Sequence, residues 1–191
     1  MCNRYRMTAR QAELARAHGI EPPYPEDVTI PPPEVFPKRP AYVVRAEAGA
    51  RRLDTMTWGF PPPPGARAPV TNVRNLASPF WRTALSRPDR RCLVPVTEFC
   101  EWEGEKGSKV ARWFSIPSRP LFAFAGVWRQ TEAGPTYAFL TCDPNPIVAA
   151  AHPKAMPVIL DEDDYARWLG GTMEDVLELA VPYPSQLMTV T

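Results

Sequence analysis

Apolar and polar residues alternate along several short stretches of this chain, with the two-residue period of strands that bury one face. The two clearest stretches, 41–46 and 51–58, lie on either side of Glu47-Ala48-Gly49-Ala50, which predicts two strands joined by a tight turn. Further strands are expected over residues 92–96, 99–102, 111–116, 121–128, 136–142 and 156–160. The pattern therefore predicts a protein built mainly on β-sheet.

Helical signals are fewer, and the first lies close to the N-terminus. Thr8, with Gln11 three residues later, predicts a capping box and an alanine-rich helix that ends at Gly19. His18 falls in the last turn of this helix, where a partly charged imidazole would suit the helix dipole. Residues 21–40 are proline-rich and predict a connector with little regular structure.

The C-terminal part of the chain carries two more helix signals. The acidic run 161–164 is expected to begin a short helix that ends at Gly170, because negative charge is favourable at a helix N-terminus. Thr172, with Asp175 three residues later, predicts the cap of a last helix. Together the patterns predict an α+β fold, sheet-dominated with short flanking helices, in a single domain over residues 1–191.

Composition narrows the class of protein. At 191 residues, with 45% hydrophobic and 23% charged residues, the chain has the make-up of an ordinary soluble globule. No apolar run is long enough to span a membrane, and no secretory signal is visible at the N-terminus. The four cysteines lack C-x-x-C spacing and there are only two histidines, which argues against a zinc site. We expect a cytoplasmic monomer with free thiols and no cofactor.

Cys2 has chemistry that no internal cysteine has. A small second residue generally allows the initiator Met1 to be removed, which leaves Cys2 with a free α-amine next to its thiol. The α-amine has an ordinary pKa of about 7.7–8.0, so part of it is neutral near pH 7 and can attack an aldehyde. The thiol can then close onto the imine carbon to give a five-membered thiazolidine. The alternative is that a cysteine at this position is accidental.

Basic and aromatic residues are interleaved in the middle of the chain. Arginine clamps phosphates through a planar fork, and exposed aromatic rings stack on unpaired bases. Trp58 precedes a proline-rich loop and belongs to the same pattern. The group consists of Arg74, Phe80, Trp81, Arg82, Arg87, Arg90 and Arg91. The alternative is a solvated face above core aromatic residues.

Three polar residues are candidates for catalysis. Asn72 lies in a short extended segment, where its amide can hold a substrate oxygen or simply form a turn. Glu101 shares a predicted strand face with Phe99, so burial should raise its pKa toward the range useful for proton transfer, unless it is a charge at a strand edge. His152 begins a proline-bounded loop, where either a catalytic or a structural histidine is possible.

Five motifs occur together in the order and approximate spacing of one known family. They are Met1-Cys2-Asn3-Arg4-Tyr5, Trp58-Gly59, Asn72-Val73-Arg74, Phe99-Cys100-Glu101-Trp102 and His152-Pro153-Lys154-Ala155-Met156-Pro157. On these motifs nearly the whole chain resembles the SRAP family, the SOS response-associated peptidases, also described as abasic-site processing proteins. The resemblance implies a barrel-like mixed β-sheet and a positively charged channel for single-stranded DNA.

The resemblance also implies roles for individual residues. Cys2 would form the thiazolidine with the opened sugar of an abasic site, Asn72 would orient that sugar, and Glu101 and His152 would move protons. Arg4 and Arg74 resemble contacts to the DNA backbone. Lys154 takes a place where the family commonly has arginine, so its phosphate contact should be less directional.

The expected function is therefore an abasic-site sensor that links covalently to single-stranded DNA and shields the site from strand cleavage. Its chemistry would be lyase-like, through a Schiff base. Two alternatives remain from the residues alone. One is a cysteine-type peptidase, acting on the chain itself, that uses Cys2 with His152 and Glu101. The other is a non-covalent module that binds single-stranded DNA through its arginine and aromatic residues.

Overall fold

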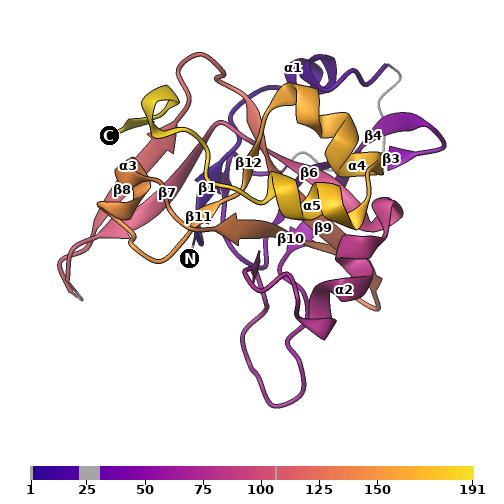
Figure 1. Cartoon of the computed structure of the whole chain (residues 1–191), viewed down its shortest axis with the longest axis horizontal. Helices are drawn as coiled ribbons and strands as arrows, with labels where there is room; N and C mark the ends of the chain where they lie inside the picture. The colour runs from indigo at the N-terminus through magenta and orange to yellow at the C-terminus, as the bar shows by residue number, and fades with distance from the viewer. Residues whose placement is uncertain (1, 22–30, 106) are drawn as a thin grey trace.

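The computed structural model describes residues 2–21, 31–105 and 107–191, and its central element is a closed barrel of five strands (Figure 1). Each strand pairs with the next around a ring, antiparallel everywhere except for the parallel pair β10–β4. In ring order the strands are β10 (Gly134–Cys142), β4 (Ala50–Trp58), β3 (Pro40–Glu47), β6 (Arg91–Val96) and β9 (Phe122–Thr131). The predicted α+β fold with a barrel-like mixed sheet is confirmed.

A second, antiparallel sheet continues directly from the barrel, because only Thr97 separates β6 from β7. In spatial order its strands are β13 (Thr189–Val190), β8 (Val110–Ser115), β7 (Glu98–Glu103), β1 (Tyr5–Arg6) and β2 (Glu34–Val35). The N-terminal residues therefore lie beside β7, although about a hundred residues separate the two segments along the chain.

Short elements close the structure around the barrel. Strand β5 pairs in parallel with β10, and α4 packs on β6. The remaining strands are β5 (Asn72–Val73), β11 (Met156–Pro157) and β12 (Ile159–Leu160). The α-helices are α1 (Gln11–Ala17), α2 (Pro79–Ser86), α3 (Pro146–Ala149), α4 (Tyr165–Gly170) and α5 (Met173–Leu179). Single 3₁₀ turns occupy Pro88–Arg90, Glu162–Asp164 and Ser185–Leu187.

The predicted strand pair around Glu47-Ala48-Gly49-Ala50 is confirmed as the hairpin β3–β4. Its two turn residues, Ala48 and Gly49, have φ angles of 50° and 83°. Two left-handed residues give the turn the twist that a two-residue hairpin needs, and glycine adopts this conformation without steric cost. The other predicted strands are also present. One prediction needs correction, because residues 156–160 form two strands that pair with β10 and β9 instead of one.

Helix α1 begins later than predicted. Its N-cap is Arg10, whose backbone N–H donates to Glu13 Oε2 at 2.9 Å, whereas Thr8 bonds to Thr97. His18 is buried, with its ring stacked on Tyr165, and burial lowers the pKa of the imidazole. The expected charge–dipole interaction at His18 is therefore wrong, since the ring is held neutral.

Two further expectations concern the proline-rich connector and membrane spans. Residues 22–30, a little under half of the connector, lie outside the described residues, and in the remainder Glu34 and Val35 form β2 instead of irregular chain. Among the helices within residues 2–21, 31–105 and 107–191, none has the length and hydropathy needed to cross a membrane.

Candidate functional site

Cys2 is held between the start of β1 and the middle of β7. Its Sγ lies 3.5 Å from the carbonyl oxygen of Arg4 and 3.8 Å from that of Cys100, and the backbone N–H of Cys100 donates to Arg4 at 2.9 Å. Only 1% of Cys2 is exposed. Burial, together with the negative charge of Glu101, raises the pKa of the Cys2 thiol well above its ordinary value. The residue is thus a fixed, protonated thiol beside a carboxyl group.

Glu101 is the next residue on β7 after Cys100, and it is 2% exposed. Its Oε1 has no hydrogen-bond partner among the residues that the structure describes. Burial raises its pKa to about 7, against opposing effects of the amino-terminal charge and Lys109. The predicted desolvation of this carboxyl is therefore present, and the group can hold or release a proton near neutral pH.

Asn72 is positioned by the parallel pairing of β5 with β10, where it lies opposite Phe139. Its Oδ1 accepts a hydrogen bond from Thr71 Oγ1 at 3.2 Å. Its Nδ2 is buried and has no acceptor within the described part of the chain. A buried amide donor without an acceptor is costly unless a substrate oxygen completes it, so Asn72 is suited to orient a bound molecule.

His152 lies between α3 and β11. Strand β11 pairs with the two residues of β10 that directly follow those paired with β5. Its Nδ1 lies 2.9 Å from the carbonyl oxygen of Ala155. Burial lowers the pKa of the imidazole, and so do the positive charges of the amino terminus, Lys154 and Lys109. The amino terminus and Lys109 also act on Glu101. The amino terminus and Lys109 are therefore within electrostatic range of both His152 and Glu101.

Trp58 and Trp81 do not have the exposure that base stacking requires. Trp58 is fully buried, with its ring 5.1 Å from Phe139, and its Nε1 donates to the carbonyl of Thr71 at 3.1 Å. Trp81 is buried against Phe60, at a ring separation of 5.0 Å. The interpretation of these two tryptophans as DNA-stacking rings is corrected. Trp58 instead fixes the backbone immediately before Asn72.

Aromatic rings that the sequence interpretation missed lie around Arg4. Its guanidinium is 4.8 Å from the ring centre of Trp113, 5.7 Å from that of Trp102 and 5.5 Å from that of Phe36. The indole of Trp102 also donates to Asn3 Oδ1 at 3.3 Å, so this cluster adjoins Cys2. Trp102 and Trp113 are half-buried and Phe36 is exposed. The available signal was strand alternation, which puts Trp102 on the same face as Cys100.

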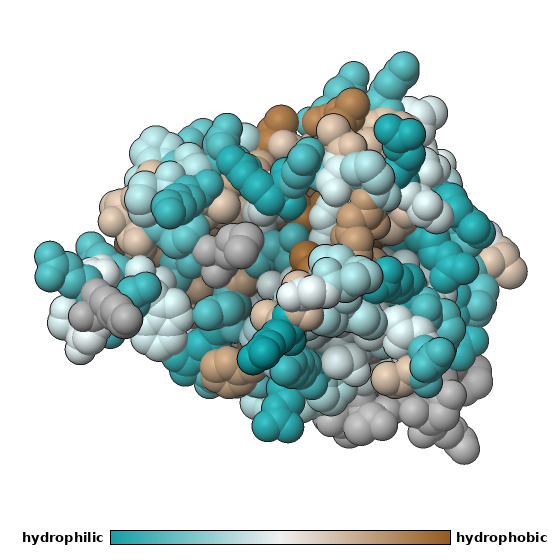
Figure 2. All heavy atoms as spheres, turned by 90° about the horizontal axis from the view of Figure 1, so that it is seen from below, coloured by the Kyte–Doolittle hydropathy of each residue, from teal (hydrophilic) through white to brown (hydrophobic). Residues whose placement is uncertain are grey.

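The arginines of the basic stretch differ in their surroundings. Arg91 is 1% exposed and donates to the carbonyls of Leu85, Trp168 and Gly171, so it is a structural residue that no phosphate can reach. Arg74 is exposed and pairs with Asp143. The other cationic candidates for DNA contact in this part of the site, Arg82 and Lys154, are exposed. The face of the molecule shown in Figure 2 is largely hydrophilic, with scattered apolar residues.

We expect Arg82→Gln to flatten the salt dependence of DNA binding. For single-stranded DNA, the slope of log affinity against log salt falls by about 0.7 for each phosphate that the protein no longer neutralises. Arg91→Gln should leave that slope unchanged and lower the melting temperature, because it removes hydrogen bonds that join β6 to α4. Arg16 is exposed on α1, so Arg16→Gln is the control that removes the same charge elsewhere on the surface. A parent slope near zero would show that these arginines are only a solvated face.

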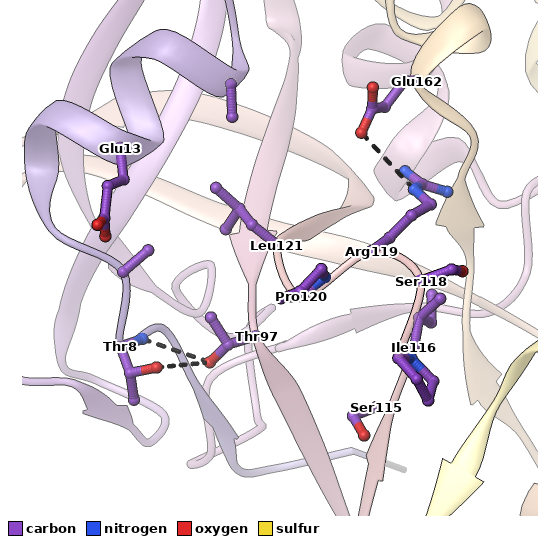
Figure 3. A pocket seen from close by; sticks show the side chains of 13 residues that line it. Thr8, Glu13, Thr97, Ser115, Ile116, Ser118, Arg119, Pro120, Leu121 and Glu162 are labelled. Carbon is purple, nitrogen blue, oxygen red and sulfur yellow. Dashed lines mark hydrogen bonds and ion pairs between the residues drawn. The ribbon is translucent and has the colours of Figure 1, made fainter.

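A large opening in the surface lies elsewhere. This cavity of about 750 Å³ is bounded by α1, Thr97, the loop after β8 and the turn at Glu162. In Figure 3, Thr8 faces Thr97 at its edge, with a hydrogen bond of 3.3 Å, and Arg119 reaches toward Glu162. Cys2, Asn72, Glu101 and His152 do not line it. Its charged residues already have ion-pair partners, Arg119 with Glu162 and Glu13 with Arg10, so we do not assign the cavity to the candidate site.

The cysteines and acidic groups form no further centre in the described residues. All four cysteines are free and buried. Within those same ranges, no group of three or more His, Cys, Asp or Glu residues is placed to hold a metal ion. The groups that remain candidates for the site are the thiol of Cys2, the carboxyl of Glu101, the imidazole of His152 and the amide of Asn72.

Comparison with known proteins places the chain in a family. The family model described as "SOS response associated peptidase (SRAP)" matches residues 1–191. The chain belongs to the SRAP family. Among curated proteins it is similar to the abasic site processing protein YoaM of Bacillus subtilis, at 27% identity over 98% of this chain and 88% of that protein. The predicted resemblance is thus confirmed.

Solved structures share the SRAP fold at lower identity. A crystal structure from Bordetella bronchiseptica has a TM-score of 0.81 at 23% identity, covering 100% of this chain and 98% of that one. A second, from Bacteroides thetaiotaomicron, has a TM-score of 0.82 at 20% identity, covering 99% of this chain and 90% of that one. These similarities concern the fold and not the chemistry of the site.

Proposed function

We propose that this SRAP protein recognises abasic sites in single-stranded DNA and links to them covalently through Cys2 after removal of Met1. The observation that carries the proposal is the position of Cys2, the second residue of the chain, beside the buried Glu101, whose pKa is raised to about 7. The name of the relative YoaM, an abasic site processing protein, supports the same substrate. The proposed setting is the cytoplasm, where thiols stay reduced, and the proposed active form is a monomer of one domain.

The chemistry follows from the two groups on Cys2. An abasic sugar opens to an aldehyde, and the neutral α-amine adds to the carbonyl carbon. Loss of water gives a Schiff base. The thiol then adds across the C=N bond: sulfur bonds to carbon, its proton goes to nitrogen, and a thiazolidine results. This lyase-like route stops short of strand cleavage, because the imine is consumed before β-elimination.

The neighbouring groups have separate roles in this proposal. Glu101 accepts a proton from the Cys2 ammonium and returns it to the leaving hydroxyl, which its raised pKa permits. His152, held neutral by burial, exchanges a proton with the sugar hydroxyl as the ring opens. The free Nδ2 donor of Asn72 binds a sugar oxygen.

Contacts to the rest of the strand complete the proposal. Arg4, Arg74, Arg82 and Lys154 hold phosphates, with Lys154 acting as a point charge. The half-buried Phe80 and the rings of Trp102, Trp113 and Phe36 provide apolar surface on which unpaired bases stack. Stacking of this kind requires bases that are not in a duplex, which favours single-stranded DNA.

A peptidase that uses the Cys2 thiolate is the second candidate. A cysteine nucleophile is normally activated by a lowered pKa, whereas burial and Glu101 raise the pKa of this thiol. The site therefore suits amine chemistry better than general proteolysis. Self-cleavage confined to Met1 is compatible with the proposal, because it would supply the free amine. Cys2→Ser separates the two schemes, since a hydroxyl can still acylate weakly but cannot form a thiazolidine.

A denaturing gel of the mature protein with an abasic-site oligonucleotide tests the proposed function. We expect a band of retarded mobility that survives denaturant, with no such band for an undamaged oligonucleotide. Cys142→Ala, which removes another buried thiol, should still form the band. A complex that falls apart in denaturant would instead establish the non-covalent binding module.

We expect His152→Ala to slow both formation and reversal of the crosslink while leaving the final extent similar. Loss of one general acid or base typically costs on the order of 10²–10⁴-fold in rate, and a catalyst acts on both directions of a step. Two time courses measure this: formation of the crosslink, and exchange onto excess unlabelled abasic DNA. If neither course changes, His152 has a purely structural role through its contact with Ala155.

A further inference from the structure

A second cavity, of about 320 Å³, lies between α2 and the C-terminal half of β9. None of the groups proposed to react with the abasic sugar lines it. Its walls combine three aromatic and three cationic side chains: Phe60, Phe80, Trp128, Arg87, Arg90 and Arg129. This composition suits a ligand that has both negative charge and a flat ring.

Two of the three cationic groups lie over aromatic rings of the cavity. The guanidinium of Arg129 lies 4.5 Å from the ring centre of Phe60 and 5.4 Å from that of Phe80. The guanidinium of Arg90 lies 4.9 Å from the ring centre of Trp128. Such contacts fix the direction of a guanidinium and leave its edge available for hydrogen bonds.

The cavity has more positive charge than its carboxylate neighbours neutralise. Arg87 forms two hydrogen bonds with Asp89, at 2.7 and 3.0 Å, and Arg90 lies 3.6 Å from the same carboxylate. Arg129 forms no ion pair in the part of the chain that the structure describes, and its nearest polar contact is a 3.3 Å hydrogen bond from Nη2 to Pro61.

Two buried donors in this cavity wall also lack acceptors. Neither the Nε of Arg129 nor the Nε1 of Trp128 has a hydrogen-bond partner within residues 2–21, 31–105 and 107–191. Buried donors of this kind are costly when left unpaired. The cavity therefore has the features of an anion site that is separate from the site at Cys2.

The composition of the cavity indicates which anion it takes, because guanidinium groups bind phosphates and aromatic rings stack on bases. On β10, Thr136 lies opposite Arg129, and Phe139 lies opposite Asn72. Residues three apart on a strand point to opposite faces, so the cavity and Asn72 are on different faces of β10. We propose that the cavity binds a phosphate, with its adjoining base, of the same DNA strand at a point beyond the abasic site. This inference rests on the proposed function for the location of that site.

Binding of undamaged single strands of about 5 and about 16 nucleotides, measured by fluorescence anisotropy at low and raised salt, tests the inference. Arg129→Gln should weaken binding of the longer strand about tenfold, the effect of removing one hydrogen bond to a charged group. It should also flatten the salt slope by about 0.7. The shorter strand cannot occupy both sites and should be affected little. Arg16→Gln, which removes the same charge from α1, should change the binding of neither strand.

A second variant covers the case in which Arg129→Gln disturbs folding. Thr83 is exposed on α2 and lines the cavity, so Thr83→Glu should repel the phosphate while Thr83→Gln should not. Normal binding of the longer strand by both Arg129→Gln and Thr83→Glu would overturn the inference. Equal competition by polyglutamate, or by a free nucleoside monophosphate, would also overturn it, because the assignment is to a nucleotide within a strand.

Failure of the proposed function is distinguishable from failure of this inference. The first is measured by the parent protein's crosslinking to a short abasic strand, and the second by non-covalent binding of undamaged strands. A parent that forms no crosslink but shows the Arg129-dependent length effect would retain the second DNA contact and refute only the chemistry at Cys2.

Discussion

Cys2→Ala is expected to abolish the stable crosslink to abasic DNA while leaving non-covalent DNA binding intact. Alanine at the second position still permits removal of Met1, so the variant keeps a free α-amine and lacks only the thiol. It can form a Schiff base but has no sulfur to close the thiazolidine. Borohydride reduction, which traps imines, should therefore restore a covalent complex in Cys2→Ala. An intact-mass measurement of the protein and of each adduct identifies which species is present.

The same experiment has an outcome that rules the mechanism out. An adduct whose mass shows that Met1 is still attached would mean that the nitrogen of Cys2 is an amide and cannot be the nucleophile. A stable adduct of Cys2→Ala without reduction would likewise move the chemistry to another residue. Cys2 is buried against the carbonyls of Arg4 and Cys100, so a melting curve of Cys2→Ala is the necessary control for folding.

Local patterns predicted most of the strands, because alternation and turn residues are properties of short segments. The hairpin at Ala48-Gly49 and the capping box of Thr172 with Asp175 are examples that the structure confirms. The closure of the barrel was not readable from these patterns. It depends on β10 meeting β4 in parallel and on β3 meeting β6 in antiparallel register, and those pairings join segments that are distant in sequence.

The features of the candidate site also divide into those that local sequence predicted and those that depend on tertiary packing. Glu101 was predicted to be desolvated from its own strand, and it is buried. Trp58 and Arg91 were misread, because tryptophan and arginine look like DNA contacts in a sequence, whereas tertiary packing buries both. In the cavity at Arg129, Phe80, Arg87 and Arg90 belonged to the predicted basic and aromatic group, whereas Phe60, Trp128 and Arg129 were missed for the opposite reason. Phe60 follows β4, Phe80 lies on α2 and Arg129 lies on β9. Only the folded chain brings Arg129 to Phe60 and Phe80.

Glu101→Gln is expected to reduce the rate of crosslinking on the order of 10²–10⁴-fold, because the amide keeps the shape of the side chain and removes its exchangeable proton. In the parent, the rate of formation should rise as pH increases through about 7, where Glu101 becomes a carboxylate that can accept a proton from the Cys2 ammonium. In Glu101→Gln that inflection should disappear, leaving only the ionisation of the α-amine at about 7.7–8.0. Single-turnover rates over a pH series measure both features.

The stability of the two proteins gives an independent check on the pKa of Glu101. Its pKa rises from 4.5 to about 7 on burial, so between these values the folded state binds more protons than the unfolded state. The stabilisation is fully present below pH 4.5 and is lost as pH rises through about 7, amounting to about 3 kcal/mol. Relative to Glu101→Gln, the melting temperature of the parent should therefore fall by about 2–4 °C per kcal/mol over this window. If the melting temperatures of the two proteins changed with pH in the same way, Glu101 would already be ionised at acidic pH. Proton transfer from the amine would then have to involve Asn72 and a bound water.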